Sequence, residues 1–137
     1  MAFDPSSEYP IGTRRPDLVF TPGGVALGRV TLDALRAGEL AAAEIRATPA
    51  TLRMQAEVAL AASRTQLAES FERAAELAAV PDDLLLEVYT ALRPRRATAA
   101  ELEEWAARLD GFDASRTAAF VREAAAAYAE RGLLADG

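Results

Sequence analysis

From residue 48 to the end of the chain, apolar residues recur with a helical period. The first predicted helix, 48–62, begins with Thr48, which can cap it, and with Pro49, whose missing N–H costs nothing in a first turn. Ser63 and Thr65 predict a break, and a second helix follows over 66–79. The first helix has two apolar stripes, so we expect it to be buried on two sides, whereas the second has one apolar face. The stripes of the first are Leu52, Ala56 and Ala59, and Met54, Val58 and Ala61; the face of the second is Leu67, Phe71, Ala74, Ala75 and Ala78.

A third helix is predicted after Pro81, which disfavours helical geometry in the residue before it. We interpret Asp82 as the cap of this helix and Asp83 as a first-turn carboxylate that the helix dipole favours. Pro94 ends the helix, and three arginines lie close to its C-terminus, where positive charge is favourable. Its predicted inward residues are Leu85, Val88, Tyr89 and Leu92, and the arginines are Arg93, Arg95 and Arg96.

Two more helices complete the predicted bundle. Thr98 and Glu101 form the capping-box pattern TAAE at the start of a helix that Gly111 ends. Ser115 is expected to cap the last helix, and Gly132 to close it. Trp105 could be a stacking platform for a ligand, but its spacing is more typical of the core. The apolar faces are Leu102, Trp105, Ala106 and Leu109, then Phe120, Val121, Ala124, Ala125 and Tyr128.

Residues 1–47 follow a different pattern. Four prolines within the first 22 residues exclude a long helix, and a turn is expected at Gly23 and Gly24. One short helix should begin at Thr31 and end at Gly38, with another turn near 41–46. The predicted fold is therefore all-α: a small bundle of about five helices over 48–137, preceded by an extended, proline-rich N-terminal arm over 1–47.

The amino-acid composition limits the kinds of partner and the cellular location that we expect. The chain of 137 residues has a net charge of −6, no basic block longer than two residues and no apolar run of membrane-spanning length. These features argue against nucleic acid as the main partner and against a membrane protein. The N-terminus lacks the regions of a secretory signal, so we expect a cytoplasmic protein.

Several catalytic residue types are missing. The sequence has no histidine, cysteine or lysine, which removes the commonest general base and metal ligand, the thiol nucleophile and Schiff-base chemistry. A hydrolase using Asp82 and Asp83 would need two carboxyl groups facing across a cleft. Capping already explains both carboxylates, so we expect no catalytic, cofactor-binding or metal-binding residue on this chain.

Three segments resemble a known family. The runs TPATLRMQAEVA, FERAAELAAVPDDLLLEVYTALRPRRAT and AAFVREAAAAYAERG are similar to the small subunit of adenosylcobalamin-dependent diol and glycerol dehydratases. The likeness covers about residues 9–132, including the arm through YP at 9, TP at 21 and TL at 31. The run from Phe71 through Pro94 is the most specific part.

The resemblance implies a hetero-oligomer of large, medium and small subunits, two of each. It implies that adenosylcobalamin lies between the large and medium subunits, and that the small subunit packs on the large one without supplying a catalytic residue. The complex would convert 1,2-diols or glycerol to aldehydes by radical dehydration, with preference between these substrates left open. This chemistry belongs to the cofactor.

Enclosure in a bacterial microcompartment is also raised by the resemblance. Diol-type members often carry a longer, alanine-rich N-terminal extension associated with such compartments. That extension is missing here, which argues against enclosure.

The arm is where we expect contact with the large subunit. Its prolines prevent a self-contained fold, yet it carries many apolar side chains that would gain by lying across a partner. The expected contact residues are Tyr9, Pro10, Leu18, Phe20, Pro22, Leu32 and Leu35. The alternative is a free-standing helical adaptor or regulatory module with no enzymatic role, which would fold cooperatively as a soluble monomer.

Overall fold

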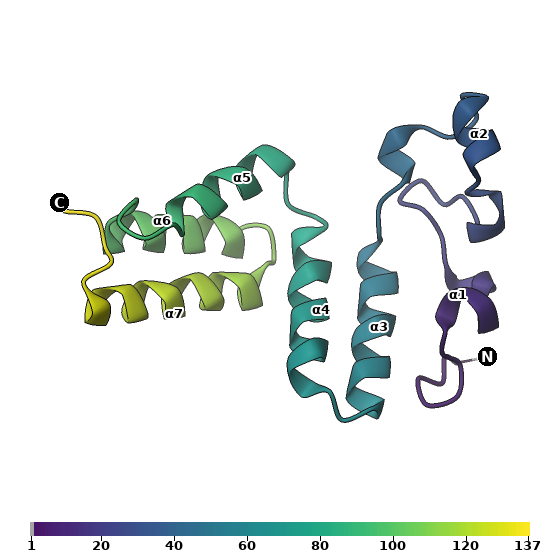
Figure 1. Cartoon of the computed structure of the whole chain (residues 1–137), viewed down its shortest axis with the longest axis horizontal. Coiled ribbons are helices and arrows are strands. Elements are labelled where there is room, and N and C mark those ends of the chain that lie inside the picture. Colours follow the sequence, from purple (N-terminus) through teal and green to yellow (C-terminus); the bar gives the residue numbers. More distant parts are fainter. Residues whose placement is uncertain (1) are drawn as a thin grey trace. The chain divides into compact units, whose positions relative to one another are not determined.

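The computed structural model describes residues 2–137, and every regular element among them is a helix (Figure 1). Five helices are long: α3 (Pro49–Ala61), α4 (Thr65–Leu77), α5 (Asp82–Ala91), α6 (Ala99–Asp110) and α7 (Ser115–Arg131). Two short helices, α1 (Ile11–Arg14) and α2 (Leu32–Arg36), precede them, with 3₁₀ turns η1 (Pro16–Leu18), η2 (Leu27–Arg29) and η3 (Ala42–Glu44). The predicted all-α fold with five substantial helices is confirmed.

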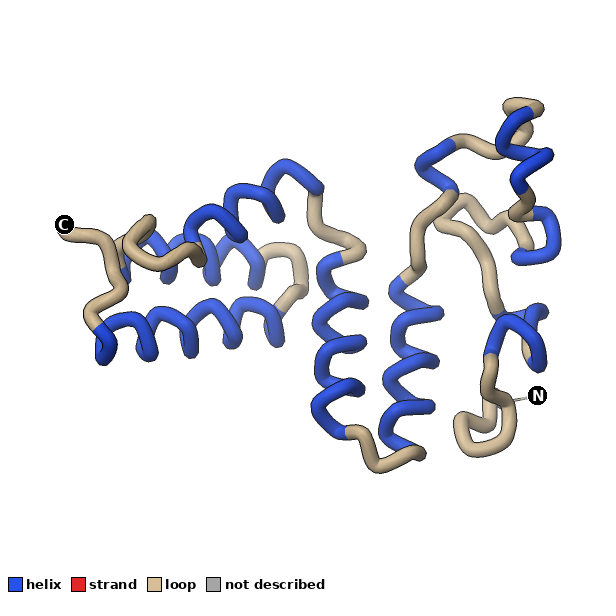
Figure 2. Tube along the Cα trace, in the orientation of Figure 1, coloured by secondary structure: helices blue, strands red, loops and turns tan. Residues whose placement is uncertain are grey.

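The arm contains more regular structure than the one short helix we predicted. Figure 2 shows short helical turns separated by loops throughout residues 10–45. Prolines explain the pattern, because Pro10 stands immediately before α1 and Pro16 is the first residue of η1. A proline forbids a long helix but is favourable where a short one begins.

A tight turn after Phe20 is present, as the glycines predicted. The Thr21 N–H donates to the Val25 carbonyl at 2.9 Å, and Phe20 and Ala26 form an isolated antiparallel bridge. Gly24 has φ +84°, a conformation that side chains rarely adopt.

The chain divides into two compact units, Met1–Ala78 and Ala79–Gly137. In this division α3 and α4 fall in the same unit as the arm, and the boundary expected at residue 47, between an arm and a helical domain, stays a prediction. In the first unit α3 and α4 pack side by side through alanines, which allow close helix approach. The buried residues of this contact are Ala56, Ala59 and Ala68, with Phe71 packed against them.

The second unit has the larger continuous core. Helices α6 and α7 pack against each other, and Leu102, Leu109 and Val121 are fully buried between them. Helix α5 adds its inner face to the same core through Leu84 and Val88. The C-terminal tail then closes on the loop after α5, where the Ala135 N–H donates to the Ala97 carbonyl at 2.9 Å.

The inward face predicted for α5 was partly wrong. Tyr89 is 62% exposed, while Leu84 and Ala91, which we did not assign, are buried with Val88. Leu85 and Leu92 are half-buried against this core. Three successive leucines fit more than one helical phase, so only packing against α6 decided which side faces inward.

Two predicted caps lie where expected and two do not. The Thr48 and Thr98 hydroxyls accept backbone N–H bonds at 3.2 Å, and Glu101 completes the capping box. Asp82 is instead the first residue of α5, with Pro81 at the N-cap position, and Ser115 is the first residue of α7, after Ala114. Both helices begin one residue earlier than a side-chain cap requires, so the prediction that Asp82 and Ser115 are caps is wrong.

Candidate subunit interface

The contact residues predicted in the arm differ in their exposure. Tyr9, Pro10, Phe20, Pro22 and Leu32 are exposed. Leu18 and Leu35 are half-buried within their own unit. Exposed aromatic and aliphatic side chains of this size are typical of surfaces that another protein covers.

Tyr9 lines a surface groove on the first unit. The groove has a volume of about 370 Å³ and is lined by residues of α3 and α4, including Val58, Leu67 and Phe71. Tyr9 is 57% exposed and Leu67 is also exposed. The groove is therefore lined mainly by apolar and aromatic side chains, with Gln55 and Arg64 among them.

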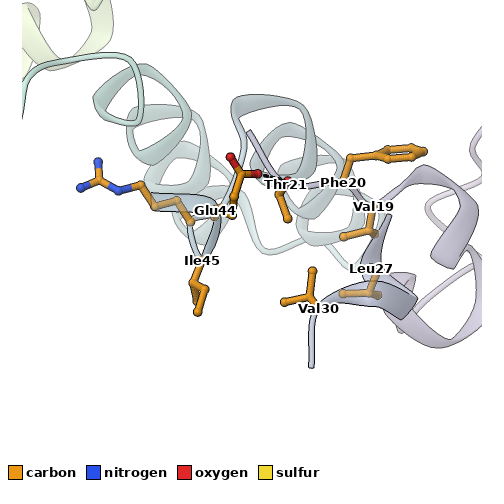
Figure 3. A pocket seen from close by; sticks show the side chains of 9 residues that line it. Val19, Phe20, Thr21, Leu27, Val30, Glu44 and Ile45 are labelled. Carbon is orange, nitrogen blue, oxygen red and sulfur yellow. Dashed lines mark hydrogen bonds between the residues drawn. The ribbon is translucent and has the colours of Figure 1, made fainter. Parts of the chain in front are cut away.

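Phe20 belongs to a second, smaller pocket of about 240 Å³, which also includes Leu27, Val30 and Ile45 (Figure 3). Figure 3 shows the Glu44 carboxylate facing Thr21, while the Phe20 ring points outward. Ile45 is exposed as well. Phe20 and Ile45 thus add a second apolar surface to the arm.

Glu44 fixes the shape of this pocket. Its carboxylate accepts a short hydrogen bond from the Thr21 hydroxyl and another from the Gly23 N–H at 3.0 Å. A Cβ at residue 23 would lie 2.5 Å from a Glu44 carboxylate oxygen, so any larger residue would force the Glu44 side chain to move away from its hydrogen-bond donors. The Glu44 side chain therefore links residues 21–23 to η3.

An arginine fixes the start of the arm. The Arg15 guanidinium, whose side chain is only 13% exposed, contacts Glu8 at 2.9 Å and Asp17 at 3.0 Å. Arg15 lowers the pKa of Asp17 below its usual value, chiefly through their side-chain hydrogen bond. The ion pair between Glu8 and Arg15 therefore joins the two ends of the segment that carries Tyr9 and Pro10.

The predicted contact residues do not form one patch. Tyr9 lies at the α3–α4 groove, Phe20 at the pocket near η3, and Leu32 on α2. Pro22 lines a further groove with Pro49 and Arg53 at the start of α3. The turns of the arm distribute these residues over several surfaces.

Among residues 2–137, seven large exposed apolar residues were not predicted as contacts: Ile45, Leu60, Leu67, Leu86, Tyr89, Phe112 and Phe120. Ile45 follows η3 in a stretch with weak periodicity, and Leu86 and Tyr89 occupy the outer face of α5. For α5 the sequence did indicate exposed apolar residues. The helix has apolar residues on every side, and a single core can bury only one side.

Asp82 and Asp83 do not face each other across a cleft. They are consecutive residues in the first turn of α5 and both are exposed. Among residues 2–137, no group of three carboxylates is placed to hold a metal ion. The described helices also include none that is long and apolar enough to cross a membrane.

Comparison with known proteins identifies the family. Residues 5–135 match the family described as "Dehydratase small subunit". The chain is 48% identical over 129 residues to the propanediol dehydratase small subunits of Citrobacter freundii and Salmonella typhimurium, and each match covers 93% of this chain and 75% of the relative. On this match over nearly its whole length, the chain belongs to the dehydratase small subunit family.

Proposed function

We propose that this chain is the non-catalytic small subunit of a propanediol dehydratase, a hydro-lyase that depends on adenosylcobalamin. The observation that carries the proposal is the 48% identity over 129 residues to two propanediol dehydratase small subunits. Its partners are a large and a medium subunit, and the substrate class is 1,2-diols or glycerol.

The composition supports a non-catalytic role. The chain has no histidine to coordinate cobalt and no cysteine or lysine to act as a nucleophile. Adenosylcobalamin supplies the radical chemistry of dehydration when it is bound, and we place it on the partner subunits. The role of this chain is then to bind and stabilise the large subunit.

The arm supports a role in assembly. Tyr9, Phe20, Leu32 and Ile45 are large apolar side chains left exposed on a segment whose backbone is fixed by Glu44 and Arg15. A preformed apolar surface loses little entropy on binding, which makes it a better contact than a loose tail. We therefore propose that these surfaces pack on the large subunit.

Co-expression with the large and medium subunits tests the proposal. The full chain should co-purify with both, and dehydratase activity should be present in the complex. Removing residues 2–30 should remove the chain from the complex or weaken its retention. A chain that remains a cooperatively folding monomer and does not co-purify would contradict the proposal and favour a free-standing adaptor.

Point variants separate contact from folding. Tyr9→Ser and Phe20→Ser change exposed side chains, so the isolated chain should keep its circular dichroism and melting temperature. Their retention in the complex should fall. Leu60→Ser is the matched control, because Leu60 is equally exposed but lies on α3, outside the arm. Equal loss in all three variants would contradict a specific role for the arm.

A further inference from the structure

The exposed face of α5 carries one row of side chains. Asp82, Leu86, Tyr89 and Arg93 follow one another at spacings of four, three and four residues, which places them along the same side of a helix. All of them are exposed, and Leu86 and Tyr89, in the middle of the row, are 67% and 62% exposed. The row therefore runs from a carboxylate, through two large apolar side chains, to a guanidinium.

The end of α5 keeps Arg93 in this row, although the helix itself ends at Ala91. The Leu92 N–H donates to the Val88 carbonyl at 2.9 Å, as in an α-helix. The Arg93 N–H donates to the Thr90 carbonyl at 3.2 Å, as in a 3₁₀ turn. Both hydrogen bonds continue the winding of the backbone through Arg93.

Both charged ends of the row can accept a partner from outside the chain. Among residues 2–137, Arg93 forms no ion pair. The helix dipole favours a cation there, but it supplies no acceptor for the guanidinium. Asp82 has an interaction within the chain, and its carboxylate has a second oxygen that can accept from another donor.

The order of these residues is complementary to itself. A second copy can lie antiparallel to the first, related to it by a two-fold axis midway between residues 86 and 89. Asp82 then faces Arg93 of the second copy, and Leu86 faces Tyr89 of the second copy. The register agrees because Asp82 precedes Leu86 by four residues and Arg93 follows Tyr89 by four. Two ion pairs would therefore flank two apolar contacts.

A groove beside Leu86 gives the tyrosine of the second copy a place to lie. The groove has a volume of about 470 Å³ and is lined by Leu86, Thr90, Ala91 and Trp105 among others. Because Leu86 faces Tyr89 of the second copy, that ring reaches the rim of the groove. Tyrosine is one of the residues that most often anchor protein interfaces.

We propose that two copies of this chain associate through their α5 helices, which pack antiparallel about a two-fold axis. Asp82 of each copy pairs with Arg93 of the other, around a centre formed by Leu86 and Tyr89. The proposal goes beyond the proposed function, since the contact joins two small subunits and involves neither the large nor the medium one. A contact along one short helix is smaller than a standard interface of roughly 800 Å² per partner, so the association is weak and reversible.

Other occupants fit the row less well. A parallel pair of α5 helices would set Asp82 against Asp82 and Arg93 against Arg93, and like charges facing each other oppose association. An unrelated partner would have to present a cation, two apolar side chains and a carboxylate in the reverse order at the same spacing. The chain itself carries that order, which is why a second copy is the occupant that we select.

Sedimentation of the purified full chain over a range of concentrations tests the dimer. The unaltered chain should show an equilibrium between monomer and dimer that added salt shifts toward the monomer. Asp82→Arg should weaken dimerisation about tenfold or more, because it sets arginine against arginine twice. Asp82→Arg with Arg93→Asp in the same chain should restore dimerisation, since both ion pairs form again with their charges exchanged. Glu123→Arg is the matched control, because it makes the same change of charge at an exposed residue of α7, and it should leave dimerisation unchanged.

Disulfide trapping tests the register and leaves one ion pair intact. The sequence has no cysteine, so Asp82→Cys and Arg93→Cys each introduce a single thiol. A mixture of the two variants should cross-link faster than either variant alone, because residues 82 and 93 of different copies face each other. The two residues 82 of a dimer would lie about 16 Å apart along the helices, beyond the reach of a disulfide.

The outcomes separate the dimer from other uses of this face. A chain that remains a monomer at every concentration would overturn the proposal, and so would a mixture that cross-links no faster than either variant alone. A charge exchange that keeps the circular dichroism of the chain but does not restore dimerisation would also overturn it. So would a monomeric chain whose Leu86→Ser, Tyr89→Ser variant is lost from the complex with the large and medium subunits, since that result would assign the face to another subunit. Sedimentation of the chain alone involves neither of those subunits, so the dimer and the proposed function can fail separately.

Discussion

The hydroxyl of Tyr128 donates a hydrogen bond to the backbone carbonyl of Leu92, with 2.6 Å between the two oxygens. The bond joins α7 to the C-cap residue of α5, 36 positions earlier in the chain. It satisfies a carbonyl that α5 leaves without an intrahelical partner. The end of α5, and the turn that follows it, are therefore positioned by the last helix.

Tyr128→Phe should lower the free energy of unfolding by about 1 kcal/mol, since the half-buried hydroxyl is removed and the carbonyl is left without its donor. Urea denaturation of the full chain measures the change. Tyr89→Phe is the control, because the Tyr89 side chain is exposed, and it should be neutral. Equal effects of the two variants would contradict the role of the hydrogen bond.

Acid should weaken the contact between α6 and α7. Arg122 contacts Glu103 at 2.8 Å and Asp110 at 2.9 Å, and its hydrogen bond lowers the pKa of Glu103 below its usual value. A carboxyl with a lowered pKa in the folded state adds stability above its unfolded pKa, and this stability is lost as the pH falls through the folded pKa. Arg122→Gln should therefore be destabilising at neutral pH, with a difference from the unaltered chain that shrinks in acid.

Nuclear magnetic resonance titration checks the same contact directly. In Arg122→Gln, the pKa of Glu103 should rise toward the ordinary value of glutamate, because the hydrogen bond from Arg122 that lowers it is lost. A pKa of Glu103 that does not respond to the loss of Arg122 would mean that another group holds it down.

Gly23→Ala should destabilise the first unit by about 1 kcal/mol, because the new methyl group displaces the Glu44 carboxylate and breaks its hydrogen bonds to Thr21 and Gly23. A double-mutant cycle with Glu44→Ala isolates the effect. Once Glu44 is alanine, Gly23→Ala should cost little. Strictly additive losses in the cycle would show that the two residues do not act on each other.

Thr98→Ala should cost about 0.5–2 kcal/mol, the usual loss for an N-cap threonine, since it breaks the capping box with Glu101. Ser115→Ala should change stability by no more than about 0.5 kcal/mol, because Ser115 is the first residue of α7 and makes no cap hydrogen bond. Thermal or urea unfolding of both variants gives the comparison. A larger loss at Ser115 than at Thr98 would reverse our assignment of the caps.

Local signals in the sequence determined the helices and most of their ends. Threonine at 48 with proline at 49, the pattern TAAE at 98–101 and glycine at 132 act through hydrogen bonds and backbone angles within one turn, so they can be recognised without a fold. The absence of histidine, cysteine and lysine, together with the run from Phe71 through Pro94, pointed to a non-catalytic subunit of a known family.

Only the tertiary structure decided which apolar residues remain outside. The run Leu84–Leu85–Leu86 gives every face of α5 an apolar residue, and contact with Leu102 and Leu109 of the core selected Leu84 and left Leu86 exposed. In the arm, contacts distant in sequence, such as Glu44 with Thr21, distributed Tyr9, Phe20 and Leu32 over separate surfaces. Such pairings depend on how distant segments meet, which periodicity along the chain does not encode.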